Sequence, residues 1–164
     1  MSHNILSKVD RALAAYLVSV GAGTINDVYP AKRSDNKALP NTVCHSMKWR
    51  YAVPHSGVYV VSAQVMVKTL GAPELDQPAL DVENQSTFRV ADTFDAFFAG
   101  VDSSSEALAA AITAAARGTA AEDLQDFTIQ TCEALGGDAG NDRNGPAWVD
   151  SIDLEIVCCP RDVS

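Results

Sequence analysis

The sequence predicts an α+β fold, with a mainly antiparallel sheet of about four strands and helices packed on one face. Two observations carry this prediction. Two stretches repeat their apolar residues with the period of a helix, and two pairs of stretches alternate with the two-residue period of a half-buried strand. The 164 residues are enough to bury a core, and we expect one domain over residues 1–164. In such a fold the sheet face opposite the helices stays available to a partner.

The first element is an amphipathic helix, predicted from about residue 4 to residue 20. Lys8, Asp10 and Arg11 take the solvent side of this helix. Gly21 follows the last helical position, where glycine commonly ends a helix. The apolar stripe expected to face the sheet consists of Ile5, Leu6, Val9, Leu13, Tyr16, Leu17 and Val20.

A long loop is predicted next, over about residues 21–41. It carries three of the 12 basic residues of the chain, namely Lys32, Arg33 and Lys37. A connection this long in a small domain is usually functional or mobile. We therefore take these three cations as candidates for docking on the acidic surface of a neighbouring subunit. Contact with phosphates, or a solvated loop with nothing bound, are the alternatives.

A first strand pair is predicted over residues 42–51 and 57–70, joined by a turn with Pro54 and Gly57. In the first strand, the apolar side is expected to hold Val43, His45, Met47, Trp49 and Tyr51. In the second strand, Tyr59, Val61, Ala63, Val65 and Val67 alternate with a mixed face. A mixed face of this kind is often covered by another subunit.

An acidic loop with prolines follows, and then a helical part of the chain. A second helix is predicted to begin at Ser103, because Ser103 and Glu106 have the spacing of a capping box, and to end at Arg117 before Gly118. Its many alanines favour close packing on the sheet. Before it, aromatic and small residues recur at helical spacing: Phe88, Ala91, Phe94, Phe97 and Phe98.

A second strand pair is predicted over residues 127–135 and 148–158. The glycine- and aspartate-rich segment between them, about residues 136–147, is expected to be a long exposed loop. The alternation of the last strand fixes its orientation, because a slip of one residue would bury Asp153 and Glu155.

The composition and charge of the chain argue against some classes of function. With 21 acidic and 12 basic residues the net charge is −9, which argues against a nucleic-acid-binding surface over the whole protein. DNA can still pass nearby, because an acidic wall repels phosphates. No apolar run approaches the roughly 20 residues of a membrane helix. The N-terminus has no features of a secretory signal, so we expect synthesis in a cytoplasm.

The cysteines are expected to be idle thiols, as is usual in a reducing cytosol. None belongs to a C-x-x-C pair, so neither a zinc site nor a thioredoxin-like site is supported. Cys158 and Cys159 are adjacent in a strand and should point to opposite faces, one into the core and one outward. A disulfide between subunits through Cys158 or Cys159 is the sharper alternative. The four cysteines are Cys44, Cys132, Cys158 and Cys159.

A catalytic thiol is a further alternative, with Cys44 or Cys132 as the nucleophile. His45 or His55 would then serve as its base, but no nucleophile signature or oxyanion loop accompanies either cysteine. The segment from Gly136 to Asp142 lacks the spacing of a calcium loop. We therefore predict no catalytic residue, no metal site and no cofactor, and expect that the chain is not an enzyme.

Three segments carry a resemblance to a known family. They are Ile5-Leu6-x-x-Val9-x-x-x-Leu13, then Val28-Tyr29-Pro30, then Leu39-Pro40-Asn41 before the first strand. Together with the order helix, loop, hairpin, helical insert and hairpin, they resemble the tail-terminator and tail-completion (neck) proteins of tailed bacteriophages. The resemblance covers nearly the whole chain and is one of pattern and length.

The resemblance implies a virion structural protein, made in the bacterial host cytoplasm, that forms a ring, commonly a hexamer. The ring would contact the tail tube protein and the neck or connector proteins, and DNA would pass through its channel without specific binding. A neck or head-completion protein is an alternative within the same class. From other classes, a soluble dimeric ligand-binding or regulatory module and a small thiol enzyme remain open.

Overall fold

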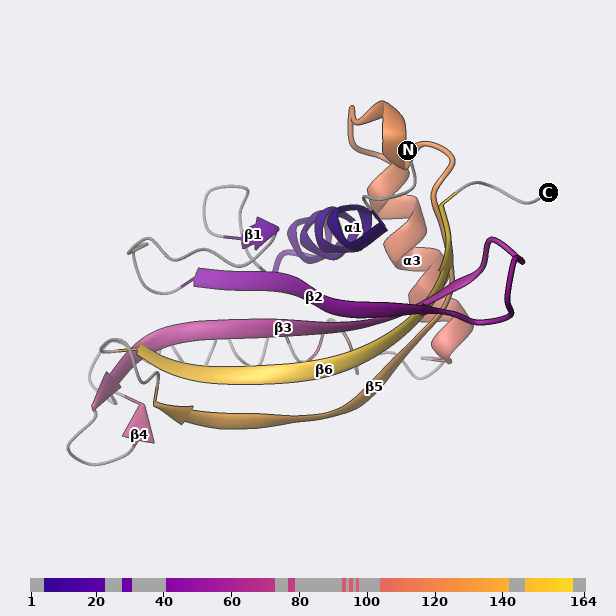
Figure 1. The fold of residues 1–164 in the computed structure, drawn as a ribbon. Coiled ribbons are helices and arrows are strands. Elements are labelled where there is room, and N and C mark those ends of the chain that lie inside the picture. The colour runs from indigo at the N-terminus through magenta and orange to yellow at the C-terminus, as the bar shows by residue number, and fades with distance from the viewer. Residues whose placement is uncertain are drawn as a thin grey trace.

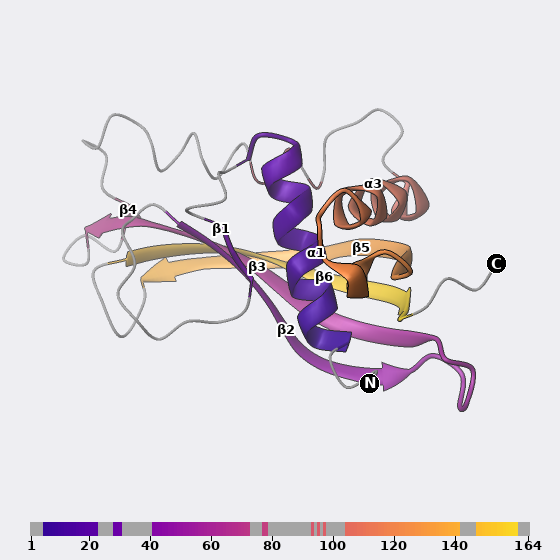
Figure 2. The same ribbon diagram turned by 90° about the horizontal axis from the view of Figure 1, so that it is seen from above.

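The computed structural model describes residues 5–22, 28–30, 41–72, 77–78, 93, 95, 97, 104–141 and 147–160. These residues form an α+β fold with a mainly antiparallel sheet and two helices, so the predicted fold class is confirmed. Both helices lie over the same face of the twisted sheet (Figure 1). Seen from above, the two helices lie at a large angle to one another, and α1 crosses the strands (Figure 2).

The sheet has the strand order β1, β2, β3, β6, β5. All neighbouring strands are antiparallel except β1, which runs parallel to β2. A two-residue strand, β4, pairs with the end of β3. The four long strands match the four predicted ones. The bounds are β1 Val28–Pro30, β2 Asn41–Tyr51, β3 Tyr59–Ala72, β4 Gln77–Pro78, β5 Thr128–Asn141 and β6 Ala147–Cys159.

Helix α1, Ile5–Ser19, confirms the first predicted helix and packs the apolar stripe from Ile5 to Leu17 against the core. Two predictions for it are wrong: Val20 lies beyond the helix and is 49% exposed rather than facing the sheet, and Asp10 is buried rather than on the solvent side. The Ser46 backbone N–H donates to Asp10 Oδ1 at 2.6 Å, and the Ser46 hydroxyl donates to the same oxygen at 2.5 Å. Burial raises the pKa of Asp10, and these hydrogen bonds oppose the rise. Asp10 thus ties α1 to β2.

Helix α3, Ser105–Arg117, ends before Gly118 as predicted, but its start is one residue later than expected. The cap is Ser104 rather than Ser103, because the Ser104 hydroxyl accepts from the Ala107 backbone N–H at 3.1 Å. Buried Thr113 anchors the helix, since its hydroxyl accepts from the Ile129 backbone N–H of β5 at 3.0 Å. Residues 93, 95 and 97 are helical, while Phe88, Ala91, Phe94 and Phe98 lie outside the described residues.

Strand β2 contains a bulge that the sequence pattern did not reveal. Its register against β3 shifts between Ser46 and Lys48, which leaves Met47 as the extra residue. The prediction of one apolar side running from residue 43 to residue 51 is therefore wrong. Cys44 and Ser46 point to the helices before the bulge, and Trp49 shares that side after it because it pairs with buried Val61.

Strand β5 is longer than predicted and reaches Asn141, so residues 136–141 are strand rather than loop. Two glycines make this possible. Gly136 has a φ of +143° next to a second bulge, a conformation that side chains rarely adopt. At Gly137 a Cβ atom would lie 1.9 Å from the Ser151 carbonyl oxygen, so only glycine fits there. The other predicted loop, residues 21–41, also contains strand β1.

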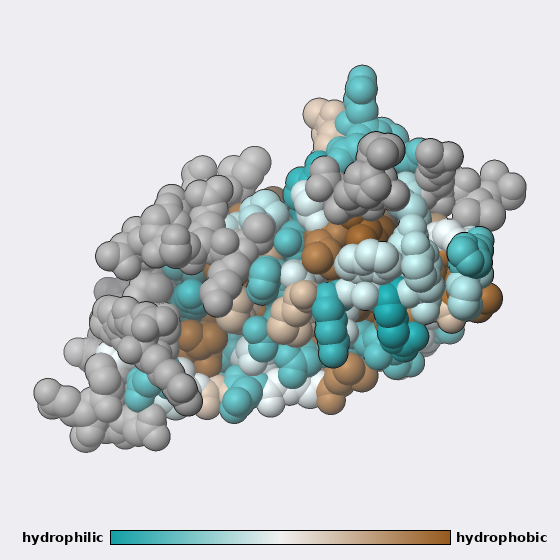
Figure 3. Space-filling view, in the orientation of Figure 1, coloured by the Kyte–Doolittle hydropathy of each residue, from teal (hydrophilic) through white to brown (hydrophobic). Residues whose placement is uncertain are grey.

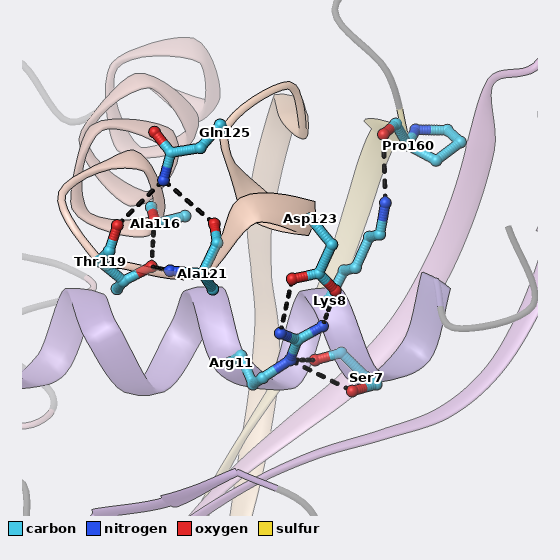
Figure 4. Close-up of polar contacts among 9 residues, drawn as sticks. All are labelled: Ser7, Lys8, Arg11, Ala116, Thr119, Ala121, Asp123, Gln125 and Pro160. Carbon is cyan, nitrogen blue, oxygen red and sulfur yellow. Dashed lines mark hydrogen bonds and ion pairs between the residues drawn. The ribbon is translucent and has the colours of Figure 1, made fainter. Parts of the chain in front are cut away.

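A polar cluster fixes α1 against the connection that follows α3 (Figure 4). Arg11 of α1 holds Asp123 with two hydrogen bonds, of 3.0 and 2.5 Å. Asp123 belongs to the 3-10 turn η3, Glu122–Leu124. The hydrogen bonds from Arg11 lower the pKa of Asp123. Lys8 Nζ also donates to the Pro160 carbonyl at 3.4 Å, so α1 contacts the end of β6 as well.

Candidate functional site

The end of the β2–β3 hairpin concentrates exposed apolar side chains. Eight large apolar residues are exposed among the described residues, and four of them fall within seven positions of the chain. We call these four the hairpin-end patch: Met47, Trp49, Tyr51 and Val53, between 46% and 61% exposed. Single exposed apolar residues are ordinary, whereas a concentration of them marks a contact surface for another molecule.

The aromatic rings of the hairpin hold one another in place. Trp49 packs edge-on against Tyr51 and Tyr59, with ring centroids 5.3 and 5.4 Å apart. Tyr51 and Tyr59 are also 5.3 Å apart and face each other across the two strands. Edge-on aromatic pairs at these distances contribute about 0.5–1.5 kcal/mol each beyond area burial. The rings are therefore ordered before any partner arrives.

The turn that follows β2, and that contains Val53 of the hairpin-end patch, is closed by its own hydrogen bonds. The Ala52 N–H donates to the Val58 carbonyl at 2.9 Å, and the Ser56 hydroxyl donates to the Val53 carbonyl at 2.6 Å. His55 adopts a φ of +61°, an uncommon conformation for a residue other than glycine. The hairpin projects past the rest of the sheet (Figures 1 and 2).

On the sheet face opposite the helices, two basic residues lie on one side and two acidic residues lie on the other. Residues that pair directly across neighbouring strands share a face, and one such row runs from Lys48 through Ser62 and Glu155 to Glu133. Arg50 lies two residues from Lys48 on the same side of β2. We call Lys48 and Arg50 the basic margin, and Glu133 and Glu155 the acidic margin. The first lies on β2 and the second on β5 and β6.

These charges have no opposite charge beside them in the part of the chain that the structure describes. The single salt bridge there is Arg11–Asp123, on the helix side. On the open face, Asp153 accepts a hydrogen bond from the neutral Gln64 amide at 3.1 Å. Figure 3 shows hydrophilic surface and separate apolar patches side by side over the described strands. The predicted outward orientation of Asp153 and Glu155 is confirmed by their pairing partners.

The cysteines are buried, and burial raises the pKa of each thiol. The pKa is about 12 at both Cys132 and Cys158, and that of Cys44 is higher still. A thiol with so high a pKa holds almost no thiolate at neutral pH. His45 follows Cys44 on the opposite face of β2, and His55 lies in the exposed turn. Neither histidine is therefore placed to serve as a base for Cys44.

The expectation that one of Cys158 and Cys159 is exposed is wrong. Both are at most 2% exposed: Cys158 lies in the core, and the Gln130 side chain contacts Cys159, with Nε2 3.3 Å from its sulfur. A disulfide between subunits would therefore need the Gln130 side chain to move away from Cys159 or the core to open around Cys158, and it stays a prediction. Lys32, Arg33 and Lys37, the predicted subunit-docking residues, lie outside the described residues.

A shallow pocket of about 380 Å³ lies between α3 and β5. Cys132 lies in its lining, and the negative charge of Glu133, whose side chain leaves the opposite face of the sheet, adds to the rise in the pKa of the Cys132 thiol. The pocket thus holds no activated nucleophile. It is lined by Phe97, Ser104, Ser105, Leu108, Cys132, Glu133 and Ala134.

The described residues contain no group of three or more His, Cys, Asp or Glu side chains arranged to hold a metal ion. Their helices are too short or too polar to cross a membrane. Comparison with known proteins found no family model and no curated protein that matches the chain.

Proposed function

We propose that this chain is a structural protein of a tailed-bacteriophage virion. It forms an oligomeric ring that ends the tail tube and joins it to the neck and head. The order α1, β2–β3 hairpin, α3, β5–β6 hairpin supports this proposal, because it is the order on which the family resemblance rests. The work of such a protein is done by contact surfaces.

The hairpin-end patch is the observation that carries the proposal. Its preordered aromatic rings offer a rigid apolar surface, the kind that dominates the energetics of protein–protein contacts. A rigid surface loses little conformational entropy on binding. In a ring each copy presents the same patch, and several weak contacts then act together on the end of a tube or a neck. We assign the hairpin-end patch to the neighbouring virion protein rather than to the ring itself.

The net charge of −9 fits a channel for DNA, because a negative wall does not retain phosphates. A channel lined with negative charge would let DNA pass without binding it. Accordingly, the ring should show no specific affinity for duplex DNA at physiological salt.

Electron microscopy of the purified chain, alone and with tail tubes assembled in its absence, tests the proposal. We expect rings, and rings bound at one end of the tubes. Trp49→Ser with Tyr51→Ser should leave the rings intact and remove them from the tubes. Rings that bind isolated heads instead of tubes would favour the neck or head-completion alternative. A dimer with no affinity for either structure would contradict the proposal and favour the dimeric module.

A further inference from the structure

We infer that the open face of the sheet is the docking surface between copies of this chain. The basic margin of one copy, Lys48 and Arg50, contacts the acidic margin of the next, Glu133 and Glu155. This inference rests on the proposed function in one respect, namely that the chain assembles with itself.

The acidic margin is unfavourable in an isolated copy. Glu133 of β5 and Glu155 of β6 pair directly across the two strands, so their side chains leave the same face side by side. Like charges in this position destabilise a sheet. Among the described residues no cation lies within salt-bridge distance of either carboxylate. A positive group from outside the copy would remove this repulsion.

The basic margin contains positive groups, but within one copy they lie too far from the acidic margin to pair with it. Lys48 lies two strands from Glu155 and three strands from Glu133 in one paired row. At about 4.8 Å between strands, these separations are about 10 and 14 Å. Lys48 and Arg50 are exposed and form no ion pair among the described residues. Glu133 is exposed and Glu155 is partly exposed, so both margins are accessible to a neighbouring copy.

A second copy fits because the two margins complement each other. Each has two charges of one sign, and between them the row holds the small neutral side chain of Ser62, which leaves room for a neighbour. A head-to-tail contact joins the β2 side of one copy to the β5 side of the next, as a closed ring requires. The attraction also offsets the general repulsion between two chains of net charge −9.

Two reversals of charge test this inference. In Lys48→Glu with Arg50→Glu, both margins become negative. In Glu133→Lys with Glu155→Lys, both become positive. Each variant alone should associate at least about a hundredfold more weakly than the original chain, because like charges then face each other. A 1:1 mixture of the two variants should assemble again with alternating copies. The chain carrying all four substitutions should assemble by itself.

Sedimentation and native mass spectrometry at low and high salt provide the readout. The matched control for Glu133→Lys with Glu155→Lys is Glu106→Lys with Glu122→Lys, which makes the same change in net charge at exposed positions outside the sheet. It should assemble like the original chain. Far-UV circular dichroism of each variant checks that it folds, and the rescue in the mixture requires folded partners in any case.

The outcomes separate this inference from the proposed function. If the original chain assembles and the two reversal variants assemble equally well, the open face is not the docking surface, while the ring proposal stands. If the reversals weaken assembly but the mixture does not restore it, the margins do not contact each other and the inference is wrong. If Lys48 and Arg50 instead retain duplex DNA, a nucleic acid is their partner. If the original chain never associates, the proposed function fails as well.

Discussion

The two faces of the sheet use alternate residues of the same strands and differ in how fully their contacts are satisfied. On the helix side, Val61, Ala63 and Val65 are fully buried under the helices. Asp10, the one charged residue that is buried among those the structure describes, has both hydrogen bonds to Ser46 within the chain. On the opposite side, the basic and acidic margins face outward without partners in the described chain. The part of the first face that the helices cover is complete as it folds, whereas its exposed end at Trp49 and the whole second face are complete only after docking.

This difference separates stability from function. Substitutions on the helix side should change the free energy of unfolding, since buried contacts dominate folding. Substitutions at exposed charges should change it little and alter association instead. The predictions below test that separation, from the largest expected effect on folding to the smallest.

Leu13→Ala should have the largest effect. Leu13 of α1 is fully buried in the core, and its truncation should lower the free energy of unfolding by about 2–5 kcal/mol. Val18→Ala, at a partly exposed position near the end of the same helix, is the matched control and should change stability by less than about 0.5 kcal/mol. Urea titration followed by circular dichroism measures both. Similar losses in the two variants would mean that α1 does not pack as described.

Gly137→Ala should have the second-largest effect on the free energy of unfolding. The new Cβ atom would meet the Ser151 carbonyl oxygen at 1.9 Å, so β5 and β6 must separate locally. We expect a loss of about 1–3 kcal/mol in the free energy of unfolding. Gly140→Ala in the same strand has open space at its Cβ position and should be nearly neutral. Thermal unfolding of the pair measures the contrast, and equal midpoints would show that residue 137 lies in a loop after all.

Asp10→Asn should alter how stability depends on pH. Burial raises the pKa of Asp10 in the folded chain above its ordinary value of 3.8, so the folded chain binds this proton more tightly than the unfolded chain. The resulting stabilisation is present below pH 3.8 and is lost as the pH rises through the raised pKa. Asparagine keeps an oxygen acceptor for Ser46 but does not titrate. The unfolding free energy of the original chain minus that of the variant should therefore fall from pH 4 to pH 7. A constant or rising difference would contradict a raised pKa.

Glu133→Gln should have the smallest effect on the free energy of unfolding, and it should raise this free energy rather than lower it. Removing one of two like charges that face each other should raise the free energy of unfolding of the isolated copy by about 0.2–1 kcal/mol. The same substitution should weaken association, because it removes half of the acidic margin. Asp126→Asn, an exposed acid outside the sheet, is the control for net charge. Urea titration at a concentration below self-association measures stability. A loss of stability would show that Glu133 already has a favourable partner in the chain.

Periodicity was sufficient to predict the helices and the long strands. The alternation predicts β3 and β6 to within two residues of their bounds, because every second residue of β3 is apolar and β6 alternates apolar with polar residues. The glycine-rich half of β5 has no side-chain alternation to read, and only its pairing with β6 identifies it as a strand. Strand β1 is three residues long and parallel, too short for any period to appear. The capping-box spacing to Glu106 favours Ser103 as the cap, but Ser104, with the same chemistry one position later, is the residue that caps the helix.

The candidate contact surfaces are harder to predict from the sequence than the helices and strands are. The side of β2 that Trp49 occupies depends on the bulge at Met47, which leaves no mark in the pattern. The acidic margin depends on the register that sets Glu133 opposite Glu155, and register is a property of the assembled sheet. Asp10 looked like a solvent-side residue, because its hydrogen bonds come from a strand 36 positions away. Long-range pairing of this kind cannot be read from local periodicity.

Native mass spectrometry of the purified chain, recorded over a series of salt concentrations, tests most directly whether this protein works by assembling with itself. The account predicts one closed species, a whole multiple of the 17.3 kDa chain, that dissociates as salt screens the two margins. A mass of 17.3 kDa at every salt and protein concentration would contradict it.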